Sequence, residues 1–283
     1  MWQLLLTISI LAATASVLVQ RAILRDVKVN PVVYTIVTQL LTSVVITVYV
    51  LLKGPHFTNL HHLIPNFALM VILLSVANVL TSRALQLISA AELMIIMGSR
   101  SLWAIFVAIL FLHEVYTLER AIGTVLILLS VYLVSYKKSL KVIHFSKGEL
   151  LAAIAAMCFG IEFANDAYIA RTVDVSTYEI FVFLLPALAI LMRYPNAIRR
   201  LKSVLHSRLM LQLLPLTILS ALATIPLLLA YQVGRNESQI APLYEMTTVL
   251  TVIFSILVIK ERAYIARKLL GACVSVLGVI LLR

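Results

Sequence analysis

Charged residues are scarce in this chain: they make up 12% of its 283 positions, whereas 62% of the positions are hydrophobic. The mean hydropathy of +1.06 is far above what a water-soluble domain carries, so a soluble globular protein is excluded. A membrane-spanning helix needs about 20 apolar residues, so ten spans would use roughly 200 positions. The remaining positions suffice for short connections but not for an additional soluble domain.

Cysteine is nearly absent as well. Cys158 and Cys273 lie far apart inside apolar segments, which predicts two packing residues rather than a disulfide or a metal site. The sequence has no glycine-rich phosphate loop, no His-Glu zinc pattern and no Gly-x-Ser-x-Gly elbow. We therefore expect no metal, no cofactor and no catalytic residue, and we predict that the protein is not an enzyme.

Ten apolar stretches follow one another along the chain. They lie at residues 2–20, 31–52, 64–88, 89–112, 121–136, 150–170, 176–194, 209–232, 239–259 and 265–282. None shows the two-residue alternation of a barrel strand, and lipid cannot satisfy an unpaired backbone, so each stretch is expected to be a helix. The first stretch lacks the basic start of a signal peptide. The predicted fold is an all-α integral membrane protein with ten transmembrane helices.

The formal net charge of +11 would suggest nucleic acid in a soluble protein, but here the basic residues gather in the short connections between apolar stretches. They are topology signals, and no nucleic-acid partner is expected. The odd-numbered connections hold sixteen Lys and Arg residues, whereas the even-numbered connections and the C-terminus hold five. The positive-inside rule then places the odd-numbered connections in the cytoplasm and both termini outside.

The two halves of the chain end in similar patterns. Residues 111–114 (Phe-Leu-His-Glu) close the fourth stretch and Gly123 follows, while residues 258–261 (Val-Ile-Lys-Glu) close the ninth stretch and Gly271 follows. Each half contains five spans, an odd number, so the second half must enter the membrane in the opposite direction. We predict a 5+5 inverted repeat with a first domain at residues 1–142 and a second at residues 143–283, an arrangement typical of secondary transporters.

With these paired motifs the whole chain resembles the EamA-type members of the drug/metabolite transporter superfamily. Their repeat ends in a small-residue helix, a leucine-rich stretch, a glutamate and a glycine-bearing helix. The resemblance implies metabolite export and both termini in the cytoplasm, the latter against the charge count. Family members commonly carry a proline partway along the fourth helix, whereas residues 96–100 of this chain have none.

Ionisable groups at membrane depth cost about 2.5 to 3.5 kcal/mol each on insertion scales, so each one suggests a functional site. Arg100, one turn before Trp103, is predicted to bind a carboxylate or phosphate of a substrate; the alternative is an ion pair with an acid on a neighbouring helix. Arg83 either joins this site or extends its stem to the membrane interface. The further residues predicted to bind substrate are Asn78, Tyr231, Tyr244 and Glu245.

Two acids of the sixth stretch, Glu162 and Asp166, lie one helical turn apart and could share a proton that a gradient loads and unloads. The alternative is that they only neutralise Arg100 or Arg83. Glu179, near the end of another stretch, is expected to be solvated.

Other polar residues are given structural roles. Glu149 is expected to be solvated near a helix end, and Glu114 and Glu261 are expected to cap helices or fix loops rather than touch substrate. Small residues on the fifth and tenth stretches allow close helix contact, either within the chain or in a homodimer. These are Gly123, Ser130, Gly271, Ser275 and Gly278.

The sequence thus predicts a secondary active transporter, an exporter of a small polar or zwitterionic metabolite such as an amino acid, working by alternating access at a midplane cavity. Its expected partners are this small molecule, the lipid bilayer and, if the acids titrate, protons. A flippase or a membrane enzyme acting on lipid-linked head groups is the alternative. The short loops favour a multi-pass protein of a prokaryotic inner (plasma) membrane.

Overall fold

The protein is seen in a computed structural model, which describes residues 2–25, 29–54, 63–112, 117–137, 142–143, 146–169, 173–197, 208–234, 243–244, 246–261 and 263–281. The helices of the first half are α1 (Trp2–Leu24), α2 (Pro31–Lys53), α3 (Ile64–Leu87), α4 (Ala90–Met97), α5 (Arg100–Leu112) and α6 (Leu118–Ser135). Those of the second half are α7 (Lys147–Ile169), α8 (Val175–Arg193), α10 (Arg208–Gly234), α12 (Met246–Leu257) and α13 (Ile265–Leu281). A two-residue hairpin, β1 (Tyr136–Lys137) with β2 (Val142–Ile143), lies between the halves.

Because α4 and α5 follow each other as one interrupted span, the described helices form ten spans, and the predicted all-α membrane fold is confirmed. Five segments are individually long and apolar enough to cross a membrane. They are Trp2–Leu24, Pro31–Lys53, Ile64–Leu87, Lys147–Asp166 and Met210–Leu227. The remaining spans include two shorter apolar helical segments, Ala121–Leu133 and Met246–Leu257.

The fourth span differs from the prediction of one helix over residues 89–112. It is broken at Gly98 and Ser99, between α4 and α5. The Gly98 amide is shared between the carbonyls of Met94 and Ile95 at 3.2 Å, and the Ser99 amide donates to the Ile96 carbonyl at 3.0 Å. These bonds to the third residue back tighten the turn, and glycine and serine allow the break because they favour a continuous helix less than alkyl residues do.

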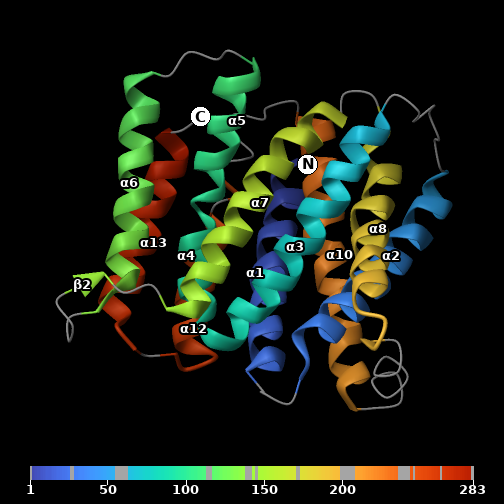
Figure 1. Ribbon diagram of the computed structural model, residues 1–283, viewed down its shortest axis with the longest axis horizontal. Coiled ribbons are helices and arrows are strands. Elements are labelled where there is room, and N and C mark those ends of the chain that lie inside the picture. The colour runs from blue at the N-terminus through green and yellow to red at the C-terminus, as the bar shows by residue number, and fades with distance from the viewer. Residues whose placement is uncertain are drawn as a thin grey trace.

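Helices pair mainly across the two halves (Figure 1). The first helix of each half packs on the third helix of the other, giving the pairs α1–α10 and α7–α3. The second helices of the halves pack on each other, as α2–α8, and so do the last helices, as α6–α13. This symmetry of contacts is that of an inverted repeat, and it places the N- and C-terminal ends at the same end of the molecule.

The small residues of α6 and α13 are used inside the chain. A Cβ atom on Gly278 would lie 2.9 Å from the Gly123 carbonyl oxygen and 2.8 Å from a side-chain carbon of Ile127. Ser130 and Ser275 are buried. The close contact that the sequence left open is therefore internal, and only the outer faces of these helices remain for a second copy of the chain.

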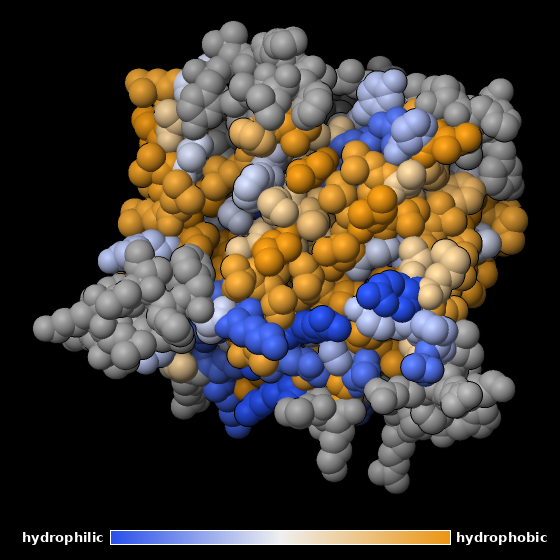
Figure 2. Space-filling view, viewed as in Figure 1, coloured by the Kyte–Doolittle hydropathy of each residue, from blue (hydrophilic) through white to orange (hydrophobic). Residues whose placement is uncertain are grey.

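The surface has the zones of a membrane protein. Figure 2 shows a broad hydrophobic band across the middle of one face, with hydrophilic residues gathered below it. That lower end is the end of the odd-numbered connections, where Arg25, Lys147, Arg193 and Lys260 are exposed. The charge bias counted along the sequence is thus a physical asymmetry between the two ends of the bundle.

Candidate functional site

A polar cluster lies where α3, α7 and α8 meet, at the end opposite the basic connections. Asn165 of α7 accepts a hydrogen bond from Asn66 of α3 at 2.7 Å and donates to the Asn66 carbonyl at 3.0 Å. The same amide group donates to Glu162 at 3.2 Å. One turn further along, Asp166 accepts a hydrogen bond from the hydroxyl of Tyr178 of α8. The two predicted acids are therefore both held by neutral donors.

Two carboxylate oxygens of this cluster are buried and have no hydrogen-bond partner in the described part of the chain: Oε2 of Glu162 and Oε2 of Glu179. Glu162 is only 1% exposed. The expectation that Glu179 is solvated was wrong for this oxygen, which is buried although Glu179 lies only one turn inside α8. Burying several carboxyl groups without a counter-charge is expensive unless they take up protons or a cation.

The alternative role of these acids, to neutralise Arg100 or Arg83, finds no support in the bonds just described, because those bonds come from neutral donors. Arg100 begins α5, against the other side of α7: a Cβ atom on Gly160 would collide with the Arg100 carbonyl and lie 2.6 Å from Cβ of Trp103. Gly160 and Glu162 are separated by about 200° around a helix axis. Arg100 and Trp103 therefore lie against a different face of α7 from the one that carries Glu162. Trp103 itself packs edge-on against Phe106, with ring centroids 6.2 Å apart.

The predicted residues of α3 lie in different surroundings. Asn78 donates to the Leu74 carbonyl of its own helix at 2.8 Å, so its amide is partly used locally. Arg83 follows the exposed stripe of α3 formed by Ile72 and Val76 and continued by Leu87. A half-buried arginine on a lipid-facing stripe near a helix end fits the alternative in which its stem extends to the interface.

The tyrosines and the acid predicted near the ninth span are only partly described. Tyr244 packs against two small apolar clusters formed by α1 and α10, one that contains Leu6 and Ala230 and one that contains Ala13 and Ala223. Tyr231 belongs to α10, but its side chain lies outside the described residues, as does Glu245. The structure therefore brings Tyr244 to the seam between the halves.

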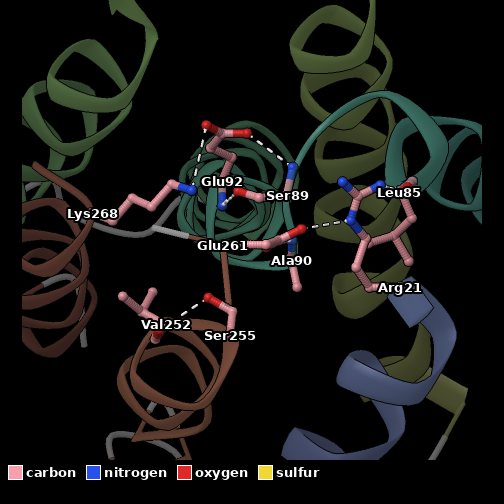
Figure 3. Close-up of polar contacts among 9 residues, drawn as sticks. All are labelled: Arg21, Leu85, Ser89, Ala90, Glu92, Val252, Ser255, Glu261 and Lys268. Carbon is pink, nitrogen blue, oxygen red and sulfur yellow. Dashed lines mark hydrogen bonds and ion pairs between the residues drawn. The ribbon is translucent and has the colours of Figure 1, made fainter. Parts of the chain in front are cut away.

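A second polar cluster closes the opposite end of the bundle (Figure 3). Arg21, in the last turn of α1, donates from Nε to Oε1 of Glu261 at 2.8 Å and from Nη1 to the Leu85 carbonyl. Glu261, in the turn between α12 and α13, also accepts from the Ala90 amide at 3.2 Å. The expectation that Glu261 caps a helix is confirmed, because Ala90 is the first residue of α4. Glu114, its sequence counterpart, lies outside the described residues.

The start of α4 ties the cluster to α13. Glu92 and Ser89 form a capping box: the Ser89 amide donates to Glu92 at 2.9 Å and the Glu92 amide donates to Ser89 at 3.2 Å. The other oxygen of Glu92 lies 3.8 Å from Nζ of Lys268, which is buried. We refer to Arg21, Ala90, Glu92, Glu261 and Lys268 as the clasp.

Glu149 repeats the arrangement at the start of α7, where the Ser146 amide donates to it at 2.6 Å. It is 4% exposed, so its expected solvation was wrong: as the third residue of a capping box its carboxylate is consumed by the backbone.

Comparison with known proteins was made for both sequence and fold. The family model of the EamA-like transporter family matches the chain twice, over residues 1–136 and 146–283. The chain belongs to the EamA-like transporter family. It is accordingly a multi-pass integral membrane protein with two repeated halves of the drug/metabolite transporter type. The family match leaves the exact division at residue 142 a prediction.

No curated protein sequence matches this EamA-like chain. A solved structure described only as "Crystal structure of protein" matches it with a TM-score of 0.59 and 15% sequence identity, over 99% of this chain and 95% of that one. At this identity the likeness concerns the fold alone.

Several site residues of this EamA-like transporter were missed from the sequence. Asn66, Tyr178 and Arg21 are single polar residues near helix ends, with no local pattern that marks a partner. The capping boxes were different, since Ser-x-x-Glu occurs at both Ser89 and Ser146 and could have been found by its spacing.

Proposed function

We propose that this chain is a secondary active transporter, an exporter of a small polar or zwitterionic metabolite such as an amino acid, rather than an enzyme. The observation that carries the proposal is the cross-half pairing of helices in an inverted repeat, with one end of the seam closed by charged side chains. Two halves that run in opposite directions can exchange roles, so that a site between them faces each side in turn. We place the protein in a prokaryotic inner membrane.

Substrate binding is assigned to Arg100, Trp103, Asn78, Arg83, Tyr231, Tyr244 and Glu245. Arg100 offers a guanidinium for a carboxylate, and Trp103 and Tyr244 offer apolar faces with a polar edge. Arg100 and Trp103 begin the half-span that follows the break in the fourth helix, and interrupted helices are where transporters of this general kind place their ligands.

Proton coupling is assigned to Glu162 and Asp166. Support comes from their burial, from the neutral donors that hold them and from the unpartnered Oε2 of Glu162. A proton taken up by one acid and shared with the other would satisfy these oxygens without a metal. If two copies of the chain associate, we expect the outer faces of α6 and α13 to meet.

The first experiment is a ligand screen by thermal stabilisation, with amino acids, nucleobases, sugars and lipid head groups added to the purified protein. A ligand at 100 times its Kd stabilises by about 2.7 kcal/mol, which is readily measured as a higher unfolding temperature. The compound found is then tested in proteoliposomes with an imposed pH gradient.

We expect flux that follows the pH gradient in the parent protein and ignores it in Glu162→Gln and in Asp166→Asn. Glu119→Gln, at an exposed acid in the first turn of α6, serves as the control and should behave as the parent. Parent flux that is indifferent to pH would remove the proton assignment. Stabilisation by lipid head groups alone would favour a flippase.

A further inference from the structure

We propose that the clasp is the gate of the transport pathway at the end of the odd-numbered connections, and that release of Glu261 opens it. The proposal rests on the transporter function given above. In this gate, Glu261 of the turn between α12 and α13 binds Arg21 at the end of α1 and Ala90 at the start of α4 (Figure 3).

Three side-chain contacts of the clasp join one half of the chain to the other. Glu261 of the second half binds Arg21 and Ala90 of the first half, and Lys268 of the second half pairs with Glu92 of the first. Alternating access requires the halves to move relative to each other, so these bonds must break and reform in each cycle. Bonds within a single helix or a single half would carry no such requirement.

The charges of the clasp are shielded from water. The side chain of Arg21 is 13% exposed, that of Glu261 is 10% exposed and that of Lys268 is 3% exposed, whereas that of Glu92 is 23% exposed. An ion pair with this little exposure loses much of its stability when one partner is removed, because the other charge stays unpaired. When the halves separate, water can reach the charges and replace the lost partners. The charges of the clasp are therefore stabilised by each other in the closed state and by water in the open state. An intermediate state, with the charges separated but still buried, is unfavourable, so the clasp behaves as a gate with two states.

The turn that carries Glu261 is held in a strained conformation. Lys260, directly before Glu261, has φ of 61°, and Tyr264 has φ of 54°. These are left-handed values that side-chain-bearing residues rarely adopt and that cluster at switch regions. The Glu261 amide is in turn fixed by the Ser255 carbonyl at 3.1 Å. Release of the Glu261 carboxylate would let the turn relax, which favours an open state with the turn rearranged.

The test measures water access behind the clasp. Ser255 of α12 is fully buried and its carbonyl holds the Glu261 amide, so a cysteine there reports on opening. The reporter is full-length protein in proteoliposomes carrying Cys158→Ala, Cys273→Ala and Ser255→Cys, treated with N-ethylmaleimide. Glu261→Gln and Arg21→Gln are each added to it. The matched control is Glu119→Gln, which removes an exposed carboxylate at the opposite end.

We expect labelling about tenfold faster in Glu261→Gln and in Arg21→Gln than in the reporter, since a hydrogen bond to a charged group contributes at least that factor. The double variant should label no faster than either single variant, because both single variants remove the same ion pair. Glu119→Gln should match the reporter. Thermal unfolding checks that each variant is folded, and Arg21→Lys, which keeps the charge, should give an intermediate rate if Arg21→Gln does not fold.

Equal labelling rates in the reporter, Glu261→Gln and Arg21→Gln would overturn the gate, as would rates that multiply in the double variant. The measurement needs no substrate, so the two proposals fail separately. Faster labelling together with no flux of any screened compound would leave the clasp in control of water access and remove the transporter proposal. Flux of a compound together with unchanged labelling would retain the transporter proposal and overturn the gate.

Discussion

At the scale of single residues, Asn165 is the most connected polar side chain of the acid cluster. It exchanges two hydrogen bonds with Asn66 and donates to Glu162, so it links α3 to the acid on its own helix. In an apolar environment, such interhelical bonds are the main directional contacts available to hold helices in register. Asn165 thus positions Glu162 as well as stabilising the α3–α7 pair.

Replacing Asn165 with Leu is expected to lower the free energy of unfolding by about 1 to 2 kcal/mol, because the Asn66 amide and Glu162 lose their partner. Asn66→Leu should have a comparable effect. The double variant should lose clearly less than the sum of the two, since both changes remove the same bonds. Unfolding by denaturant in detergent micelles measures all three. Fully additive losses would mean that the two asparagines do not interact.

The bond between Tyr178 and Asp166 leads to a second prediction. Asp166→Asn keeps an oxygen that can accept from the tyrosine hydroxyl, so stability should change by less than about 0.5 kcal/mol. Tyr178→Phe removes the donor and leaves the acid unpaired, so it should cost about 1 to 2 kcal/mol.

In the Asp166→Asn background, Tyr178→Phe should cost less, because an amide can be left unpaired more cheaply than an acid. Thermal unfolding of the four proteins of this cycle provides the measurement. A Tyr178→Phe variant as stable as the parent would show that this hydrogen bond does not matter.

Part of this site could be predicted from the sequence. Glu162 and Asp166 were found because residues four apart share a helical face, a local property. Glu179, Asn66 and Tyr178 join them from other helices, and a single sequence by itself contains no signal of such tertiary contacts. The same holds for Arg83. The sequence shows that a charge lies in an apolar stretch, but only the structure shows that this residue lies on the exposed stripe of α3.

At the scale of elements, glycines set how closely the spans approach each other. A Cβ atom on Gly98 would meet mainly the hydroxyl oxygen of Ser275 on α13, the movable end of a side chain. A Cβ atom on Gly278 would instead meet backbone, the Gly123 carbonyl oxygen at 2.9 Å and the Ile127 nitrogen at 3.0 Å. Two tight contacts of α13 therefore differ in how they can be relieved.

Gly98→Ala alone is expected to destabilise the protein by about 1 to 3 kcal/mol through overpacking. Adding Ser275→Ala should recover most of this loss, because the nearest remaining atom of residue 275 is Cβ at 3.7 Å. Gly278→Ala is the comparison variant, and the same Ser275→Ala should not rescue it. Unfolding temperatures of the single and double variants decide the matter; equal rescue of both glycine variants would contradict the packing described.

The spans themselves were predictable, since hydrophobic runs of this length leave few alternatives to helices. The break between α4 and α5 was not. Glycine and serine are common inside membrane helices, and the proline that usually marks this position in the family is missing, so nothing local distinguished Gly98 from a packing glycine.

At the scale of the whole molecule, both termini lie at the end opposite the basic connections (Figure 1). The charge bias predicts that this end faces out of the cytoplasm. Alkaline phosphatase fused to the C-terminus should therefore be active, and a green fluorescent protein fused there should be dark. As the control, the same two reporters are fused after Lys147, which is exposed at the opposite end of the molecule. There the phosphatase should be inactive and the green fluorescent protein should fluoresce. The opposite result at both positions would favour the orientation implied by the family.

The inverted repeat could be predicted because five spans per half is an odd number, a matter of counting. How the halves combine could not. Similar motifs at residues 111–114 and 258–261 show that the halves are related but not that α1 packs on α10 and α3 on α7. Those choices depend on side-chain fit along whole helices, as at Gly148, where any Cβ would press on Leu87 and Ile88.

The cross-half pairing has a consequence for synthesis of the protein. Since α1, α2, α3 and α6 each find their main neighbour in the second half, the first half leaves the ribosome before any of those neighbours exists. Its early helices must wait in the bilayer, loosely associated or shielded by the insertion machinery, until the chain is nearly complete. Assembly is therefore a late, concerted event, and a truncated or stalled chain would present unpaired faces to the cell's membrane proteases.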